Sequence, residues 1–82
     1  MILVDEPFEW TPGMWWAHMV SDQSLDELHQ FAAQLGLKRS WFQPRHRASH
    51  YDLRGFNMLH QAIKAGAKVV GTRELLRRSA NQ

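Results

Sequence analysis

The sequence predicts a small single-domain α/β sandwich, with a central sheet of three or four short strands and about three helices in the order β-β-α-α-β-α. Its 82 residues suffice for one hydrophobic core, so we expect a single domain over 1–82 with no linker. Segments with strand-like apolar patterns alternate with amphipathic helical segments, which is typical of α/β folds. A crossover through the helices would set the first and last strands side by side and parallel.

Two strands are expected near the start of the chain. Residues 1–4 are wholly apolar and end at Asp5, a pattern typical of a strand buried on both faces. Prolines and a glycine within 7–13 predict a loop. Residues 15–21 then read as a second strand. Alternation along that strand places on one face Trp16, His18 and Val20.

Three helices and a third strand follow. Ser24-x-x-Glu27 is a capping box, and apolar residues at helical spacing continue from it to a glycine at position 36. The segment 38–55 is irregular, since Pro44 interrupts any helix begun there. We then expect a helix over 56–65, a strand over 68–71 and a terminal helix capped by Thr72.

Composition excludes several classes of protein. The chain has no cysteine, so it can form neither a disulfide framework nor a thiolate metal site. Its longest apolar run is far shorter than the roughly 20 residues of a membrane helix, so no membrane partner is expected. Acidic residues directly follow Val4, which no secretory signal tolerates, and we therefore expect a cytoplasmic protein.

The charge is divided sharply along the chain. Residues 1–37 carry six acidic and no basic residues, whereas 38–82 carry ten basic and only two acidic ones. Three interpretations are open: attraction between the two parts across the fold, a basic face that binds phosphates, or head-to-tail association between copies in a homo-oligomer.

Basic and aromatic residues gather in the irregular segment. Guanidinium groups suit phosphates and aromatic faces suit bases, so this segment is a candidate for binding a nucleotide or single-stranded nucleic acid. A turn at Trp41 and Phe42 is expected to bury both rings. The other members of the cluster are Arg45, His46, Arg47, His50, Tyr51 and Arg54.

Histidines and acidic residues also recur in short groups: His18 with Asp22, Glu27 with His29, and His50 with Asp52. Along a strand His18 and Asp22 would be about 13 Å apart, too far to share one ion. On a helix Glu27 and His29 point away from each other. Only the last pair lies close together on one face of an extended segment, with about 6.6 Å between the two positions. No group has the spacing of a known metal motif, and we expect no cofactor. The candidates for a metal site are His18, His50 and Asp52.

Structural roles are the alternatives for these polar residues. Asp22 could support the turn into the first helix, and His29 could hydrogen-bond a backbone carbonyl at the edge of its apolar face. Asp52 could be a turn or N-cap residue before the second helix.

Several strings resemble one family over nearly the whole chain and in the same order. They include Ile2-Leu-Val-Asp5, Trp16-Ala-His-Met-Val-Ser-Asp22, Leu25-Asp-Glu-Leu-His-Gln-Phe-Ala32, Ser40-Trp-Phe-Gln43 and His50-Tyr-Asp52. They resemble bacterial and phage proteins grouped as domain-of-unknown-function family 4031, which implies no assigned activity.

The same resemblance ranks the candidate residues. Residues inside the family-like strings are stronger candidates for site residues than Arg45 and Arg47. They are His18, Asp22, His29, His50, Tyr51 and Asp52. The stretch 44–49 departs from the family pattern, so the basic segment is not implied to be a shared site.

The sequence leaves three functions open. The first is a non-catalytic binding module for a small anionic or nucleotide-like ligand, with a pocket where His18 meets the segment 50–52 beside the first helix. The second is a small metal-dependent hydrolase or nuclease-like enzyme that uses His18, Asp22, His50 and Asp52. The third is a protein-interaction module in which exposed tryptophans bury against a partner or a second copy.

Overall fold

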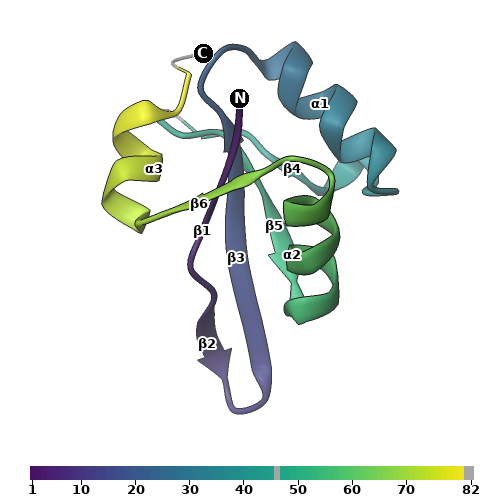
Figure 1. Ribbon diagram of the computed structural model, residues 1–82, viewed down its shortest axis with the longest axis vertical. Coiled ribbons are helices and arrows are strands. Elements are labelled where there is room, and N and C mark those ends of the chain that lie inside the picture. The colour runs from purple at the N-terminus through teal and green to yellow at the C-terminus, as the bar shows by residue number, and fades with distance from the viewer. Residues whose placement is uncertain (46, 81–82) are drawn as a thin grey trace.

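The computed structural model describes residues 1–45 and 47–80, and it shows a mixed sheet with helices on both faces (Figure 1). The strands are β1 (Ile2–Asp5), β2 (Phe8–Thr11), β3 (Met14–Ser21), β4 (Phe42–Gln43), β5 (His50–Arg54) and β6 (Lys68–Val70). The helices are α1 (Leu25–Gln34), the 3-10 turn η1 (Arg39–Trp41), α2 (Gly55–Lys64) and α3 (Thr72–Arg78).

The sheet confirms the predicted α/β class. Its strand order is β4-β5-β3-β1-β6, and β2 also pairs with β3. The first and last strands, β1 and β6, are parallel neighbours as expected, whereas the other pairs are antiparallel. The sheet has six strands, more than the three or four predicted.

The two strands beyond the expected four, β2 and β4, arise where the sequence predicted loop or irregular structure. Pro12 and Gly13 form a two-residue turn between β2 and β3, with Gly13 at φ +83°. Proline fixes φ at the first turn position and glycine accepts the positive φ of the second, so the dipeptide closes a hairpin. The prediction of a loop over 7–13 was therefore wrong for 8–11. The hairpin extends away from the helices (Figure 1).

The two faces of the sheet bury two separate hydrophobic clusters. Helices α1 and α2 cover one face, where Leu28 and Leu59 pack against Met19 and Leu53. Helix α3 covers part of the other face. Its Leu75 joins the smaller cluster, formed with Leu3, Val20 and Val70. Alternation along β1 and β3 sends successive side chains to opposite clusters.

A side-chain cap marks the start of α1, whereas α2 and α3 begin without one. The Ser24 hydroxyl accepts the backbone N–H of Glu27, as the capping box predicts. Helix α3 is instead preceded by Gly71, because the Thr72 hydroxyl donates to Asp5 rather than capping the helix.

Trp41 is 48% exposed, so the expectation that its ring is buried was wrong.

Helix α3 packs against β1, which leaves the β3–β5 part of that face open. This open part carries the candidate site described below. In the described residues no helix is long and apolar enough to cross a membrane.

Candidate functional site

Three polar side chains converge on the open part of the sheet. His50 and Asp52 are two residues apart on β5 and therefore project from the same face. The antiparallel register of β3 and β5 sets His18 directly opposite Asp52. Side chains of such a cross-strand pair are close neighbours. One potential ligand atom from each of the three residues lies within 4.8 Å of the other two.

Both histidines direct their Nε2 atoms toward the Asp52 carboxylate. His50 Nε2 lies 3.3 Å from Asp52 Oδ1, and His18 Nε2 lies 4.0 Å from the same oxygen. The two imidazole rings meet edge to face, with their centroids 5.0 Å apart. Both Nε2 atoms therefore face a common point beside Asp52.

The other ring nitrogen of each histidine, Nδ1, lies within hydrogen-bond distance of an acceptor. His18 Nδ1 lies 2.8 Å from Asp5 Oδ2, and His50 Nδ1 lies 3.0 Å from the carbonyl oxygen of Ala48. Because the carboxylate and the carbonyl can only accept, we assign the proton to Nδ1 in both rings. In each neutral ring the Nε2 lone pair then points at the site.

Ala48 adopts an unusual backbone conformation. Its φ of +54° lies in the left-handed region, which residues other than glycine seldom occupy. Such conformations cost of order 1–3 kcal/mol and cluster at functional sites. Here the strained residue supplies the carbonyl that orients His50.

Asp5 is a fully buried carboxylate behind the cluster. It accepts hydrogen bonds from the backbone N–H of His18 at 2.6 Å, from His18 Nδ1 and from the Thr72 hydroxyl at 3.0 Å. Burial acts to raise the pKa of Asp5, but these hydrogen bonds lower it below its usual value. The same contact with Asp5 raises the pKa of His18 against the effect of burial.

The arrangement has the chemistry of a metal centre. Two imidazoles and one carboxylate form a ligand set used for divalent zinc and iron, in which three protein ligands leave a position open. Metal-binding histidines usually donate their second N–H to a carboxylate or carbonyl, as both histidines do here. His18 and Asp52 are each 30% exposed, so the face toward solvent is accessible.

Aromatic and basic side chains surround the three residues. Phe8 stacks on His18 with the ring centroids 5.5 Å apart. A hollow of about 420 Å³ opens above the cluster, and its further walls are formed by Trp10, Trp16 and Arg45. The candidate centre therefore lies in the floor of a partly apolar hollow.

Asp22 lies apart from this cluster. It follows the far end of β3, where its carboxylate pairs with Arg78 at 3.2 Å and with the Met1 amino nitrogen at 2.8 Å. These contacts link the end of β3 to α3.

His29 and Tyr51 meet on the opposite face of the sheet. His29 Nδ1 lies 2.8 Å from the Tyr51 hydroxyl, and Phe42 packs against both rings. This pair ties α1 to β5, so the structure separates it from the His18–His50–Asp52 cluster. The pocket that the sequence placed beside the first helix likewise lies on the other side of the sheet from α1.

The basic candidates divide between the hollow and the surface. Arg45 lines the hollow and donates to the Gln43 side chain and to the Pro44 carbonyl. Arg47 is exposed. His46 lies outside the described residues.

Sequence reasoning missed Asp5 as a site residue. In the sequence, Asp5 marks only the end of an apolar strand. The available signal was its position, because an acidic residue at the end of a fully buried strand must find partners in the interior. Trp10 and Trp16 were also not selected, since an exposed tryptophan cannot be told from a buried one in so short a chain.

The fold and the cluster together define a small mixed α/β domain with a candidate three-ligand metal centre on the open part of its sheet. The model of the family described as protein of unknown function (DUF4031) matches residues 2–82, so the chain belongs to that family, as the resemblance predicted. No curated protein and no solved structure matches the chain.

Proposed function

We propose that the chain is a small metal-dependent hydrolase whose centre binds a divalent transition-metal ion through His18 Nε2, His50 Nε2 and the Asp52 carboxylate. The observation that carries the proposal is the convergence of these atoms within 4.8 Å, with both Nδ1 atoms held by acceptors. In the neutral rings, two lone pairs face a carboxylate oxygen. A divalent cation held by these atoms would replace this repulsion with coordination.

Three protein ligands favour a catalytic site over a structural one. Structural zinc sites are closed by four protein ligands, whereas catalytic sites keep a position open to water or substrate. A divalent ion supplies Lewis-acid polarisation of an ester oxygen and acidifies water at neutral pH.

The surrounding residues support an anionic ester as the substrate. Arg45 lines the hollow that contains the two histidines, and Arg54 lies on the other side of Asp52 in the neighbouring hollow. Guanidinium groups bind carboxylate and phosphate oxygens through paired hydrogen bonds. Phe8 and Trp16 form apolar walls of the same hollow, against which the non-polar part of an ester can pack.

The proposal is tested with the chain purified in chelator and then supplied with Zn²⁺, Mn²⁺ or Mg²⁺. We expect Zn²⁺ or Mn²⁺ to raise the melting temperature and Mg²⁺ alone to have little effect, because imidazole ligands disfavour magnesium. His50→Gln and Asp52→Asn should abolish the shift. His60→Gln is the matched control, since His60 is exposed on α2 away from the cluster.

Hydrolysis is assayed with bis(4-nitrophenyl) phosphate as a generic phosphodiester. We expect turnover with the stabilising ion and a loss of about 100-fold or more in His50→Gln and Asp52→Asn. His60→Gln should keep the activity. A melting temperature unmoved by all three ions would refute the metal centre, and ion binding without any turnover would refute the hydrolase.

A metal-free binder of small anions is the second candidate. The raised pKa of His18 favours its cationic form, which would attract an anion toward Arg45. The carboxylate of Asp52 in the middle of the cluster would repel the same anion, which is why the metal centre ranks first. Binding of inorganic phosphate to the chelator-treated protein, stronger at pH 5.5 than at pH 8, would favour this second candidate.

A further inference from the structure

We infer that the substrate of the proposed hydrolase is single-stranded nucleic acid, lying in a groove that runs past the candidate metal centre on both sides. The inference rests on the proposed function for the chemistry, but the groove is argued from side chains outside the three metal ligands.

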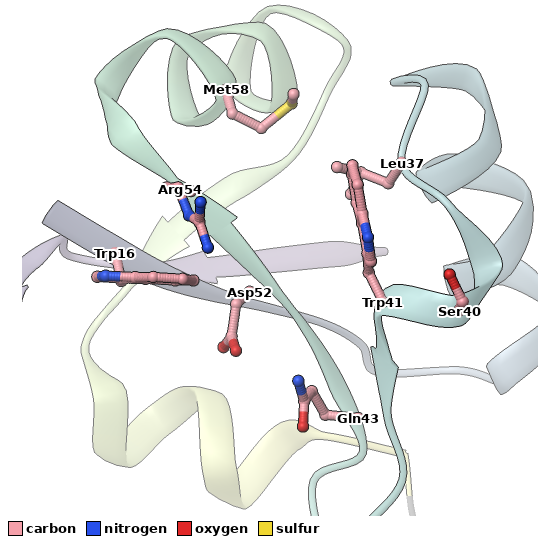
Figure 2. A pocket seen from close by; sticks show the side chains of 8 residues that line it. All are labelled: Trp16, Leu37, Ser40, Trp41, Gln43, Asp52, Arg54 and Met58. Carbon is pink, nitrogen blue, oxygen red and sulfur yellow. The ribbon is translucent and has the colours of Figure 1, made fainter. Parts of the chain in front are cut away.

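Two adjoining hollows make up the groove. One has a volume of about 420 Å³ and the other of about 520 Å³, and Trp16 and Asp52 line both. Figure 2 shows the second hollow, with Asp52 and Arg54 between the Trp16 and Trp41 rings. A small ester would fill one hollow and end at Asp52. A substrate that fills both must continue past Asp52, as a polymer does.

Tryptophan rings mark the length of the groove. Trp10 is 72% exposed at one end and Trp41 is 48% exposed at the other, with Trp16 between them in the wall of both hollows. The two exposed rings are not needed for the core. Each base stacked on such a ring contributes about 1–3 kcal/mol, and any base can stack.

Cations lie beside two of these tryptophan rings, and a third cation lines the hollow of Trp10. The Arg54 guanidinium lies 4.7 Å from the Trp16 ring centre, and the Lys38 ammonium lies 5.6 Å from that of Trp41. Arg45 lines the hollow that contains Trp10. Alternating flat rings and cations match the alternating bases and phosphates of a nucleotide chain.

These cations are available to a ligand. Within the described ranges, Arg78 is the only lysine or arginine that pairs with a carboxylate within 4.0 Å. The positive charge of the second part of the chain is therefore largely unneutralised by ion pairs. A single strand fits better than a duplex, because duplex bases are already stacked on each other and cannot cover the rings.

The proposed reaction is hydrolysis of one phosphodiester bond. The oxygen of a water molecule forms a bond to phosphorus as one ester P–O bond breaks. One proton of that water passes to the leaving alkoxide oxygen and the other to solvent. The reaction needs no other reactant.

Binding is measured by fluorescence anisotropy with labelled oligo(dT) and oligo(U) of about 8 nucleotides, in chelator and with the full chain. We expect binding of at least one oligonucleotide. Two or three phosphate contacts predict that log K falls with log salt at a slope of about −1.4 to −2.1. Trp41→Ala should weaken binding about 5- to 100-fold, and Arg54→Gln should weaken it and flatten the salt slope.

Two substitutions on other surfaces serve as matched controls. Phe56→Ala removes an exposed ring that packs on Trp15 and lines neither hollow, and Lys64→Gln removes an exposed cation of α2 that also lines neither. Both should leave binding within about twofold. Unchanged melting curves will show that each variant is folded.

The inference is overturned if neither oligonucleotide binds, if thymidine monophosphate or a duplex binds as tightly as the single strand, or if the control variants weaken binding as much as Trp41→Ala. Because binding is measured without metal, its failure leaves the metal centre standing. Failure of ion binding in the melting experiment would in turn leave a nucleic-acid-binding groove.

Discussion

Asp5 sets the geometry of the candidate centre although it does not face the hollow. Its carboxylate accepts from both the backbone N–H and Nδ1 of His18, which fixes the ring so that Nε2 points toward Asp52. Thr72 completes its hydrogen bonds from α3. A buried carboxylate destabilises a fold unless such partners are present, so the contacts that keep Asp5 in the interior also orient His18.

Replacing Asp5 by Asn should weaken ion binding without removing a ligand. Outer-shell partners of metal-binding histidines typically contribute 10- to 100-fold in affinity, and we expect a loss of about that size. Titration with Zn²⁺ measures it. Glu6→Gln removes the neighbouring exposed carboxylate and should change the affinity little. Equal affinities for wild type and Asp5→Asn would contradict the orienting role.

Protonation of His29 makes the free energy of unfolding depend on pH. Burial, with a contribution from the positive charge of Arg39, lowers the pKa of His29 below its usual value of about 6.5. The folded state therefore disfavours protonated His29. Its contribution to stability is fully present above pH 6.5 and is lost as the pH falls through the lowered pKa.

Comparison with His29→Gln isolates this effect, because glutamine can accept from Tyr51 but does not titrate. We expect the wild type to lose free energy of unfolding relative to the variant between pH 7.5 and pH 5, measured in urea with chelator present. A difference between the two proteins that is constant, or that favours the wild type at low pH, would contradict the role of burial at His29.

At the scale of elements, the pairing of β3 with β5 builds the site. The register brings together His18 and Asp52, which are far apart in the sequence, and the same register sets Trp16 opposite Arg54. A slip of one residue would send His18 and Asp52 to opposite faces. The register in turn depends on the packing of Met19, Tyr51 and Leu53 in the core of the opposite face.

Elements with local signals could be predicted from the sequence, and those without could not. Helix α1 begins at a capping box and ends beside a glycine, so its bounds followed from neighbouring residues. The β2 strand depends on a two-residue turn and on pairing with β3, and β4 is only two residues long. The register of β3 and β5 is non-local, so the sequence could propose that His18 meets His50 and Asp52 but could not give the pairing of strands that brings them together.

Helix α3 is held to the sheet by one small cluster centred on Leu75, which is almost fully buried among Leu3, Val20 and Val70. Leu75→Ala should lower the free energy of unfolding by about 2–5 kcal/mol. Leu76→Ala, at a neighbouring position that is 56% exposed, should stay within about 0.5 kcal/mol of wild type. Urea unfolding of both variants tests this, and equal losses would contradict the assigned orientation of α3.

At the scale of the whole molecule, one face of the sheet is covered by helices and the other is partly open. Helices α1 and α2 cover one face, and the larger of the two buried clusters lies between them and the sheet. Helix α3 covers only part of the other, and the open remainder carries the cluster and the hollow above it, whereas the second hollow also reaches Leu37 and Met58 at the edge of the core on the α1–α2 side. A domain of 82 residues has little surface to bury, so an open sheet face lined by histidines and tryptophans is a substantial part of its exterior.

The structure shows where the acidic and basic parts of the chain lie relative to each other. The sequence left open whether the acidic and basic parts attract each other, bind phosphates or join copies. One direct pair, Asp22 with Arg78, links the two parts in the described residues. Lys38, Arg45 and Arg54 instead lie beside tryptophans or in the groove wall, which is the arrangement on which the nucleic-acid proposal depends.

The central claim, that His18 and His50 bind a metal ion through Nε2, is tested most directly by observing the ring nitrogens. Nitrogen-15 NMR of histidine-labelled protein, titrated with Zn²⁺, should shift the Nε2 signals of His18 and His50 together and reach its end point at one ion per chain. Their Nδ1 atoms should stay protonated, and the His29 and His60 signals should not move. Coordination through Nδ1, or a titration that leaves His18 and His50 unchanged, would contradict the claim.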